Sequence, residues 1–185
     1  LIHSKEINHK KNSFINKKLV KILNNCHTVV ANSNFTKNLA ISVGVDENKI
    51  KVINPGVFPA DKIDDKIYKN IKKKLEGRTP KLITIARFDK RKNHEKIIMA
   101  LRNLKEMYPN IIYICIGQGE NIDNLKKLIT ELKLQNHVMF PNNLTKDEKN
   151  SYLKCSDVFV MPSITYKKSV EGFGMAFIDA AFHGI

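Results

Sequence analysis

Residues 81–116, KLITIARFDKRKNHEKIIMALRNLKEMYPNIIYICI, decide the fold class of this chain. Leu82 to Ala86 and Ile111 to Ile116 are continuous apolar runs, while the residues between them place apolar side chains at helical spacing. Continuous apolar strands are typical of a parallel sheet that is covered on both faces. The stretch therefore predicts a strand, a covering helix and a second strand parallel to the first.

The same alternation continues toward the end of the sequence. The expected elements are, in order, a helix at 122–132, a strand at 138–140, a helix that begins after a Thr145/Glu148 capping box, a strand at 157–161 and a helix at 174–182. Strands that alternate with helices indicate an α/β fold, here a Rossmann-like parallel sheet with helices on both faces. Ligands of such sheets bind beyond the carboxyl ends of the strands.

The amino-terminal part repeats the pattern on a smaller scale. A helix at 13–25, a strand at 28–31, a helix capped by Asn32-Ser33 and ended by Gly44, and a strand at 50–53 are expected there. Residues 54–79 are rich in Lys and Asp and show little apolar periodicity. We therefore expect the tail of an amino-terminal domain at 1–53, a linker at 54–79 and an α/β domain at 80–185.

The chain is strongly basic. Its formal net charge is +14, and residues 1–79 hold 16 basic and 7 acidic side chains. Such an excess attracts nucleic acid or anionic lipid. Because basic residues are not interleaved with aromatic ones and no recognition helix stands out, we expect no nucleic-acid partner. A basic nucleic-acid-binding protein remains an alternative that rests on charge alone.

The cysteines indicate the compartment. Cys26, Cys115 and Cys155 are odd in number and far apart, a pattern that favours free thiols in a reducing environment. No apolar run reaches the ~18–20 residues of a membrane span. We therefore expect a cytoplasmic location.

Polar or glycine-rich clusters follow the first two strands of the α/β domain. Arg87 and Lys92 could clamp a diphosphate, the arginine with a planar fork and the lysine as a point charge, or could lie in a solvated basic loop. Gly117 and Gly119 could let the backbone approach a ligand or could only make a tight turn. They lack the third glycine of the dinucleotide fingerprint, since Ile122 stands at that position.

Two further clusters follow the last strand. Ser163 could hydrogen-bond a ligand or cap a turn. Glu171 stands beside Gly172 and Gly174, and Asp179 follows eight positions after it. Eight positions of a helix rise about 12 Å, roughly the span from sugar to ribose in a nucleotide sugar. The alternative is an exposed acid that complements a helix dipole, with Asp179 an unrelated surface residue.

Six motifs between residues 28 and 185 make the sequence similar to the retaining glycosyltransferases of family four. They are Val30-Ala31-Asn32-Ser33 with Phe35-Thr36, Ile53-Asn54-Pro55-Gly56-Val57, Arg87 with Lys92, Gly117 with Gly119, Pro162-Ser163, and Glu171-Gly172-Phe173-Gly174. The resemblance implies two Rossmann-like domains of the B type, the amino-terminal one for the acceptor and the carboxyl-terminal one for the donor. Residues 80–185 would then be a nucleotide-sugar-binding domain, truncated at its carboxyl end.

The resemblance also implies a role for each candidate residue. Arg87 and Lys92 would bind the donor diphosphate and stabilise the leaving group, and Glu171 would hold the hydroxyls of the sugar. The other donor-binding candidates are Gly117, Gly119, Ser163, Gly172, Phe173, Gly174, Met175 and Asp179. Asp179 stands where the family usually has a glutamate that holds the ribose. Because aspartate is one methylene shorter, its contact would be weaker or bridged by water.

The activity implied by the resemblance is retaining transfer of a hexosyl group from a UDP- or GDP-sugar. The acceptor would be a glycan or a lipid-linked molecule of cell-envelope polysaccharide or glycolipid synthesis, with an anionic membrane surface as a further partner. No cofactor or metal is expected, because the histidines offer no ligand spacing. This stretch alone should be inactive, and a non-catalytic nucleotide-sugar-binding subunit is an alternative.

His94 is a further candidate near the Arg87 and Lys92 loop. It could reach the diphosphate, but a residue in the first turn of a helix is expected to be exposed to water. The donor base, the sugar, the acceptor and the oligomeric state stay open at the level of sequence.

Overall fold

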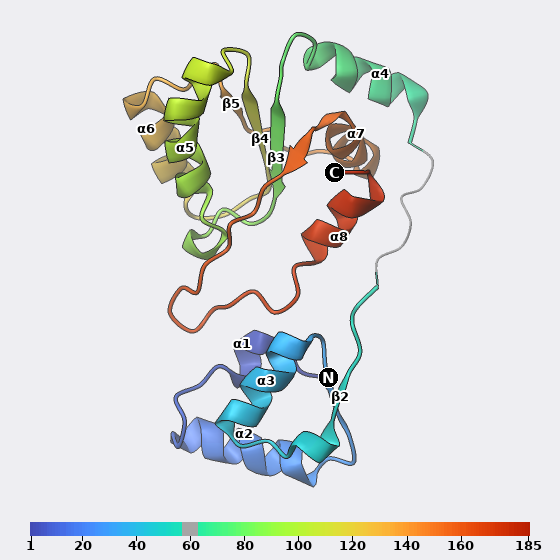
Figure 1. Cartoon of the computed structure of the whole chain (residues 1–185), viewed down its shortest axis with the longest axis vertical. Helices are drawn as coiled ribbons and strands as arrows, with labels where there is room; N and C mark the ends of the chain where they lie inside the picture. The colour runs from blue at the N-terminus through green and yellow to red at the C-terminus, as the bar shows by residue number, and fades with distance from the viewer. Residues whose placement is uncertain (57–62) are drawn as a thin grey trace. The chain divides into compact units, whose positions relative to one another are not determined.

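The computed structural model describes residues 1–56 and 63–185 (Figure 1). The chain divides into two compact units. Among the described residues, the first unit comprises 1–56 and 164–175, and the second comprises 63–163 and 176–185.

The second unit is built on one parallel sheet. Its strands are β3 (Lys81–Ile85), β4 (Ile112–Ile116), β5 (Val138–Met139) and β6 (Val158–Phe159), in the order β5-β4-β3-β6. Every neighbouring pair is parallel, with Lys81 opposite Ile112 and Tyr113 opposite Val138. The predicted α/β class with a parallel sheet is confirmed.

Helices cover both faces of this sheet (Figure 1). The helices α5 (His94–Met107) and α6 (Ile122–Glu131) pack on one face. The helices α4 (Asp65–Lys74), α7 (Lys146–Cys155) and α8 (Met175–Phe182) pack on the other. The capping box predicted at Thr145 and Glu148 begins α7.

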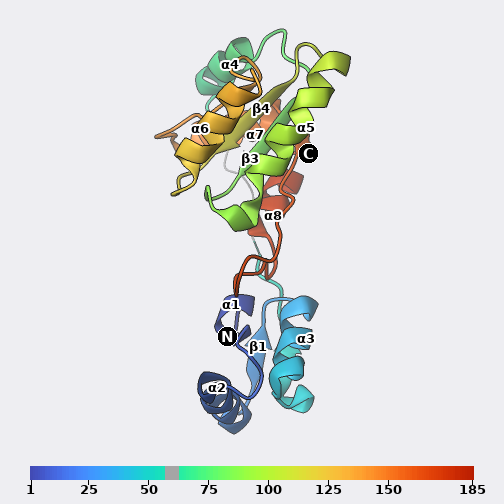
Figure 2. The same cartoon turned by 90° about the vertical axis from the view of Figure 1, so that its left-hand side faces the viewer.

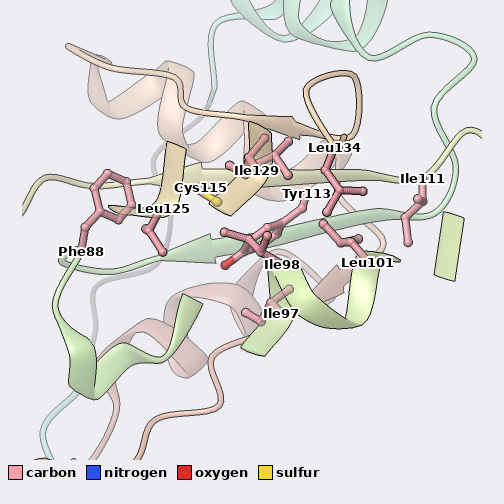
Figure 3. Close-up of a cluster of buried hydrophobic side chains, with 11 residues drawn as sticks. Phe88, Ile97, Ile98, Leu101, Ile111, Tyr113, Cys115, Leu125, Ile129 and Leu134 are labelled. Atoms are coloured by element: carbon pink, nitrogen blue, oxygen red, sulfur yellow. The ribbon is translucent and has the colours of Figure 1, made fainter. Parts of the chain in front are cut away.

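The strand β4 is buried throughout and divides its side chains between the two faces. Tyr113 and Cys115 join the cluster under α5 and α6, which Figure 3 shows, while Ile112, Ile114 and Ile116 join the other. The Tyr113 hydroxyl and the Thr84 hydroxyl are 2.7 Å apart, so this buried polar pair is hydrogen-bonded.

The helix α4 lies inside the range in which we expected only a linker. Asp64 begins it by accepting hydrogen bonds from the backbone N–H groups of Lys66 and Ile67, and Ile71 and Leu75 are buried against the sheet. Ile67, Ile71 and Leu75 follow one another at intervals of four and form a narrow apolar stripe. Because most residues around them are lysines, the composition of the segment does not indicate a helix. The expectation of a linker through residue 79 is therefore wrong for this helix.

The first unit holds a smaller parallel sheet of β1 (Val29–Ala31) and β2 (Ile50–Val52). Its helices are α1 (Ser4–Ile7), α2 (Phe14–Asn25) and α3 (Asn34–Val43), and Figure 2 shows β1 between α2 and α3. A short 3-10 turn, η1 (Glu47–Lys49), leads into β2. As predicted, Ser33 caps α3 and Gly44, with a φ of 110°, ends it.

Residues 164–175 also pack in the first unit, although they follow β6 in the sequence. The Asn8 side chain donates a hydrogen bond to the Lys168 carbonyl, and the Ser33 hydroxyl donates one to the Gly172 carbonyl. This differs from the expected assignment of all residues after 80 to one domain.

Candidate functional site

The loop after β3 carries the two cations that the sequence singled out. It contains a short 3-10 turn, η2 (Lys90–Lys92), which Asp89 caps by accepting a hydrogen bond from the Lys92 backbone N–H at 3.0 Å. The Arg87 guanidinium lies 3.4 Å from the Asp89 carboxylate, and the Arg87 side chain is 73% exposed. A surface ion pair of this kind contributes little, so the guanidinium can turn toward an incoming anion.

Lys92 differs from Arg87 because it is a buried residue, with 8% of its surface exposed. Its Nζ lies 3.3 Å from the Met161 sulfur in the loop after β6. The next residue, Asn93, donates a side-chain hydrogen bond to the Pro162 carbonyl at 3.2 Å. The loops after β3 and β6 are therefore held together, and Ser163 lies next to this junction.

Gly117 and Gly119 join the loop after β4 to the loop after β3. A Cβ added at Gly117 would lie 2.0 Å from the Ala86 carbonyl oxygen, and one at Gly119 would lie 2.5 Å from that of Phe88. The two loops are also hydrogen-bonded, because the Phe88 N–H donates to the Gln118 carbonyl at 2.9 Å. The glycines are thus required for close packing of two loops, and their role toward a ligand stays a prediction.

A cavity of about 300 Å³ opens at the carboxyl ends of β4 and β5. Gly117 and Gln118 form one wall, and Asn142, Asn143 and Lys149 contribute to the other. The sequence motifs did not predict this second wall. The polar turn directly after β5 was the available signal, since it marks the carboxyl end of a parallel strand.

Asp179 lies on α8 beside one wall of this cavity. Its carboxylate is 4.0 Å from the Nζ of Lys149, which lines the cavity. Both side chains are partly exposed, so the pair is weak and either group could turn to a ligand. The structure therefore brings Arg87, Lys92 and the two glycines to one edge of the sheet, with Asp179 on the helix next to the cavity.

The remaining candidates, Glu171 to Met175, belong to the first unit. The helix α8 begins only at Met175, so Glu171 and Asp179 do not share a helix and the expected 12 Å helical rise between them is wrong. A Cβ at Gly172 would lie 2.6 Å from the Ser4 hydroxyl oxygen. Gly174 has a φ of 82°, in the left-handed region, and Phe173 precedes it.

His94 is buried, with 2% of its surface exposed, so the expectation that it faces water is wrong. Its ring packs edge-on against Phe88, with the ring centroids 5.1 Å apart. Among the described residues, neither ring nitrogen has a hydrogen-bond partner. Burial lowers the pKa of His94 to about 4, an effect that Asp89 opposes and Lys92 supports.

Within residues 1–56 and 63–185, no three His, Cys, Asp or Glu side chains gather into a group that could hold a metal ion. No helix in this part of the chain is long and apolar enough to cross a bilayer. Cys26, Cys115 and Cys155 are free thiols, as the sequence predicted.

Comparisons with known proteins identify the family. Residues 66–185 match the family of glycosyl transferases group 1, and residues 2–61 match Glycosyltransferase Family 4. The chain therefore belongs to the group 1 glycosyl transferases.

Two curated relatives illustrate the range of this family. A GDP-mannose-dependent α-(1-6)-phosphatidylinositol monomannoside mannosyltransferase of Mycobacterium tuberculosis is 27% identical over 59% of this chain and 29% of its own length. An uncharacterized glycosyltransferase of Methanocaldococcus jannaschii is 30% identical over 85% of this chain and 40% of its own. The chain thus spans less than half of the length of either relative.

A solved structure of the same fold is HepE of Anabaena in complex with UDP and glucose. It is 21% identical to this chain with a TM-score of 0.78, over 98% of this chain and 50% of HepE. This likeness confirms the fold.

Proposed function

We propose that the whole protein transfers a hexosyl group from a UDP- or GDP-sugar to a glycan or lipid-linked acceptor, with retention of configuration. The observation that carries the proposal is the carboxyl edge of the second unit, where a buried lysine, an exposed arginine and an open cavity occur together. Family membership supports transfer, and the names of the mycobacterial relative and of HepE support GDP-mannose and UDP as donor chemistries to test first.

The second unit would hold the donor nucleotide. The cavity beside Gln118 and Asn142 offers amide donors and acceptors for a base, and about 300 Å³ suits one aromatic heterocycle better than a whole nucleotide sugar. Asp179 would accept hydrogen bonds from the ribose, in exchange for its weak contact with Lys149. Arg87 and Lys92 would hold the diphosphate through charge-assisted contacts.

Catalysis would then consist of positioning and charge stabilisation. The bond between the sugar and the diphosphate oxygen breaks, the acceptor oxygen forms the new bond on the same face, and the acceptor proton passes to the leaving diphosphate. Arg87 and Lys92 stabilise the charge that develops on this leaving group. Glu171 orients the sugar hydroxyls, and no carboxylate nucleophile of the glycosidase type is assigned.

A thermal-shift screen of this chain against UDP, GDP and ADP tests the proposal. A ligand at a hundred times its Kd stabilises the native state by about 2.7 kcal/mol. We expect one diphosphate to raise the melting temperature and Arg87→Ala to reduce the rise. If none of the three changes the melting temperature, the donor-site proposal is wrong.

Two substitutions separate the roles of the acidic residues. Asp179→Asn should weaken binding of the bare nucleoside diphosphate, because the ribose contact is present without the sugar. Glu171→Gln should leave that binding unchanged and lower turnover of the full-length protein at least tenfold, or about 1.4 kcal/mol. Equal effects of both variants on nucleotide affinity would contradict this division.

A non-catalytic nucleotide-sugar-binding subunit is the second candidate function. The observation that favours it is Asp179, which is shorter than the usual glutamate of the family and already contacts Lys149. Donor-dependent turnover by the full-length protein would exclude it, whereas nucleotide binding without turnover would support it.

A further inference from the structure

The second unit has a larger pocket, of about 520 Å³, at the other edge of its sheet. It lies where the end of α4 and the start of β3 meet the end of α7, since Lys81 is the first residue of β3 and Cys155 the last of α7. The loop with Arg87 follows the opposite, carboxyl end of β3. This pocket is therefore separate from the candidate nucleotide site.

The lining of the pocket is strongly cationic. Among the described residues that line it, Glu76 is the one carboxylate, against six cations, which are Lys69, Lys72, Lys73, Arg78, Lys81 and Lys154. The dipole of α4 favours the lysines of its last turn. It does not account for the lysines that come from other elements, or for Lys69 one turn before Lys72 and Lys73, where like charges repel.

Three of these cations are held in place by specific contacts. The Lys81 ammonium pairs with the Asp157 carboxylate at 2.9 Å. The Lys154 ammonium lies 4.8 Å from the centre of the Tyr68 ring, and an Arg78 Nη donates to the Asn136 carbonyl at 2.9 Å. Because these contacts already restrict the three side chains, the side chains lose less conformational freedom when an anion binds.

The thiol of Cys155 lines the same pocket as these cations. Burial raises the pKa of Cys155, whereas Lys72, Lys81 and Lys154 act to lower it. These three lysines come from α4, β3 and α7, so cations from three elements line one pocket together.

We propose that this pocket binds a phosphate group carried by a second ligand, independently of the nucleotide site. Phosphate accepts several charge-assisted hydrogen bonds at once, which suits convergent lysines and an arginine. The volume leaves room for more than a bare phosphate, so the group is carried by a soluble polyanion or by a lipid headgroup. Either source gives binding that weakens with added salt.

Alkylation of Cys155 in this chain measures occupancy of the pocket directly. Cys26 is also partly exposed but lies in the first unit, so it is an internal reference, and Cys115 is buried. With sodium tripolyphosphate at ten times its Kd, modification of Cys155 should slow about tenfold while that of Cys26 stays constant. In the second arm of the experiment, vesicles of phosphatidylglycerol replace tripolyphosphate, and vesicles of phosphatidylcholine, which carry no net charge, are the control.

Two matched double variants give the control. Lys72→Gln with Lys73→Gln should abolish the protection, whereas Lys126→Gln with Lys127→Gln, an exposed pair on α6, should preserve it. Arg87→Ala should also preserve it, which separates this pocket from the nucleotide site. Protection by tripolyphosphate alone identifies a soluble polyanion, and protection by phosphatidylglycerol alone identifies a headgroup. No protection in either arm, or an equal loss in both double variants, would overturn the proposal.

Discussion

Acidification should destabilise the second unit through His94. Its imidazole is buried and its pKa is lowered from 6.5 to about 4, so the folded chain resists protonation more than the unfolded chain does. The unfolded state therefore binds more protons between these two pKa values, and stability falls as the pH falls from about 6.5 to about 4. Below pH 4 and above pH 6.5 this group adds no further slope.

The size of the effect follows from the same pKa difference. A shift from 6.5 to about 4 corresponds to roughly 3 kcal/mol when the titration is complete, and to about 2 kcal/mol at pH 5. His94→Phe keeps an aromatic ring against Phe88 and removes the titrating group. A swap of similar volume costs below about 1.5 kcal/mol at neutral pH.

Urea unfolding followed by tyrosine fluorescence measures this difference, because the chain has no Trp and four of its five Tyr residues lie in the second unit. Between pH 7.5 and pH 5, the wild type should lose about 2 kcal/mol more than His94→Phe. His27→Phe, at an exposed position of the first unit, should behave like the wild type. Equal acid dependence of His94→Phe and wild type would refute the reasoning.

Three further substitutions, two of them with a control variant, each test local structure inside one of the two units. Gly119→Ala should destabilise the second unit by roughly 1–3 kcal/mol in urea, because its Cβ would lie 2.5 Å from a backbone oxygen. Gly56→Ala should have little effect, because its Cβ would meet no atom within 4 Å in the part of the chain that the structure describes. Thr145→Ala should cost about 1 kcal/mol through loss of the capping box, measured in the same way, and Thr145→Ser should restore most of it. Gly172→Ala should expose the segment 164–175 to limited proteolysis, because its Cβ would lie 2.6 Å from the Ser4 hydroxyl oxygen. Unchanged cleavage would count against that packing.

The fold was largely predictable because its determinants are local. The caps at Ser33 and Thr145, the stop at Gly44 and the apolar strands each act over a few residues, and all of them appear in the structure. The helix α4 was missed because its apolar stripe depends on a sheet that is distant in sequence.

The candidate site was predictable to the extent that parallel strands align their carboxyl ends. That rule alone brings Arg87 and Lys92 near Gly117 and Gly119. It says nothing of the burial of His94, which follows from packing on Phe88. The rule also does not predict that Glu171 lies in the first unit, because that placement depends on contacts with residues more than a hundred positions earlier.

Calorimetric titration of this chain with UDP or GDP tests the central claim, that the carboxyl edge of the second unit holds a nucleoside diphosphate. We predict binding at one site, weakened about tenfold to a hundredfold by Arg87→Ala or by Lys92→Met, which keeps the buried stem of the lysine. Lys126→Ala, a cation removed from an exposed face of α6, should bind as the wild type does. Wild-type affinity in a folded Arg87→Ala/Lys92→Met double variant would contradict the account.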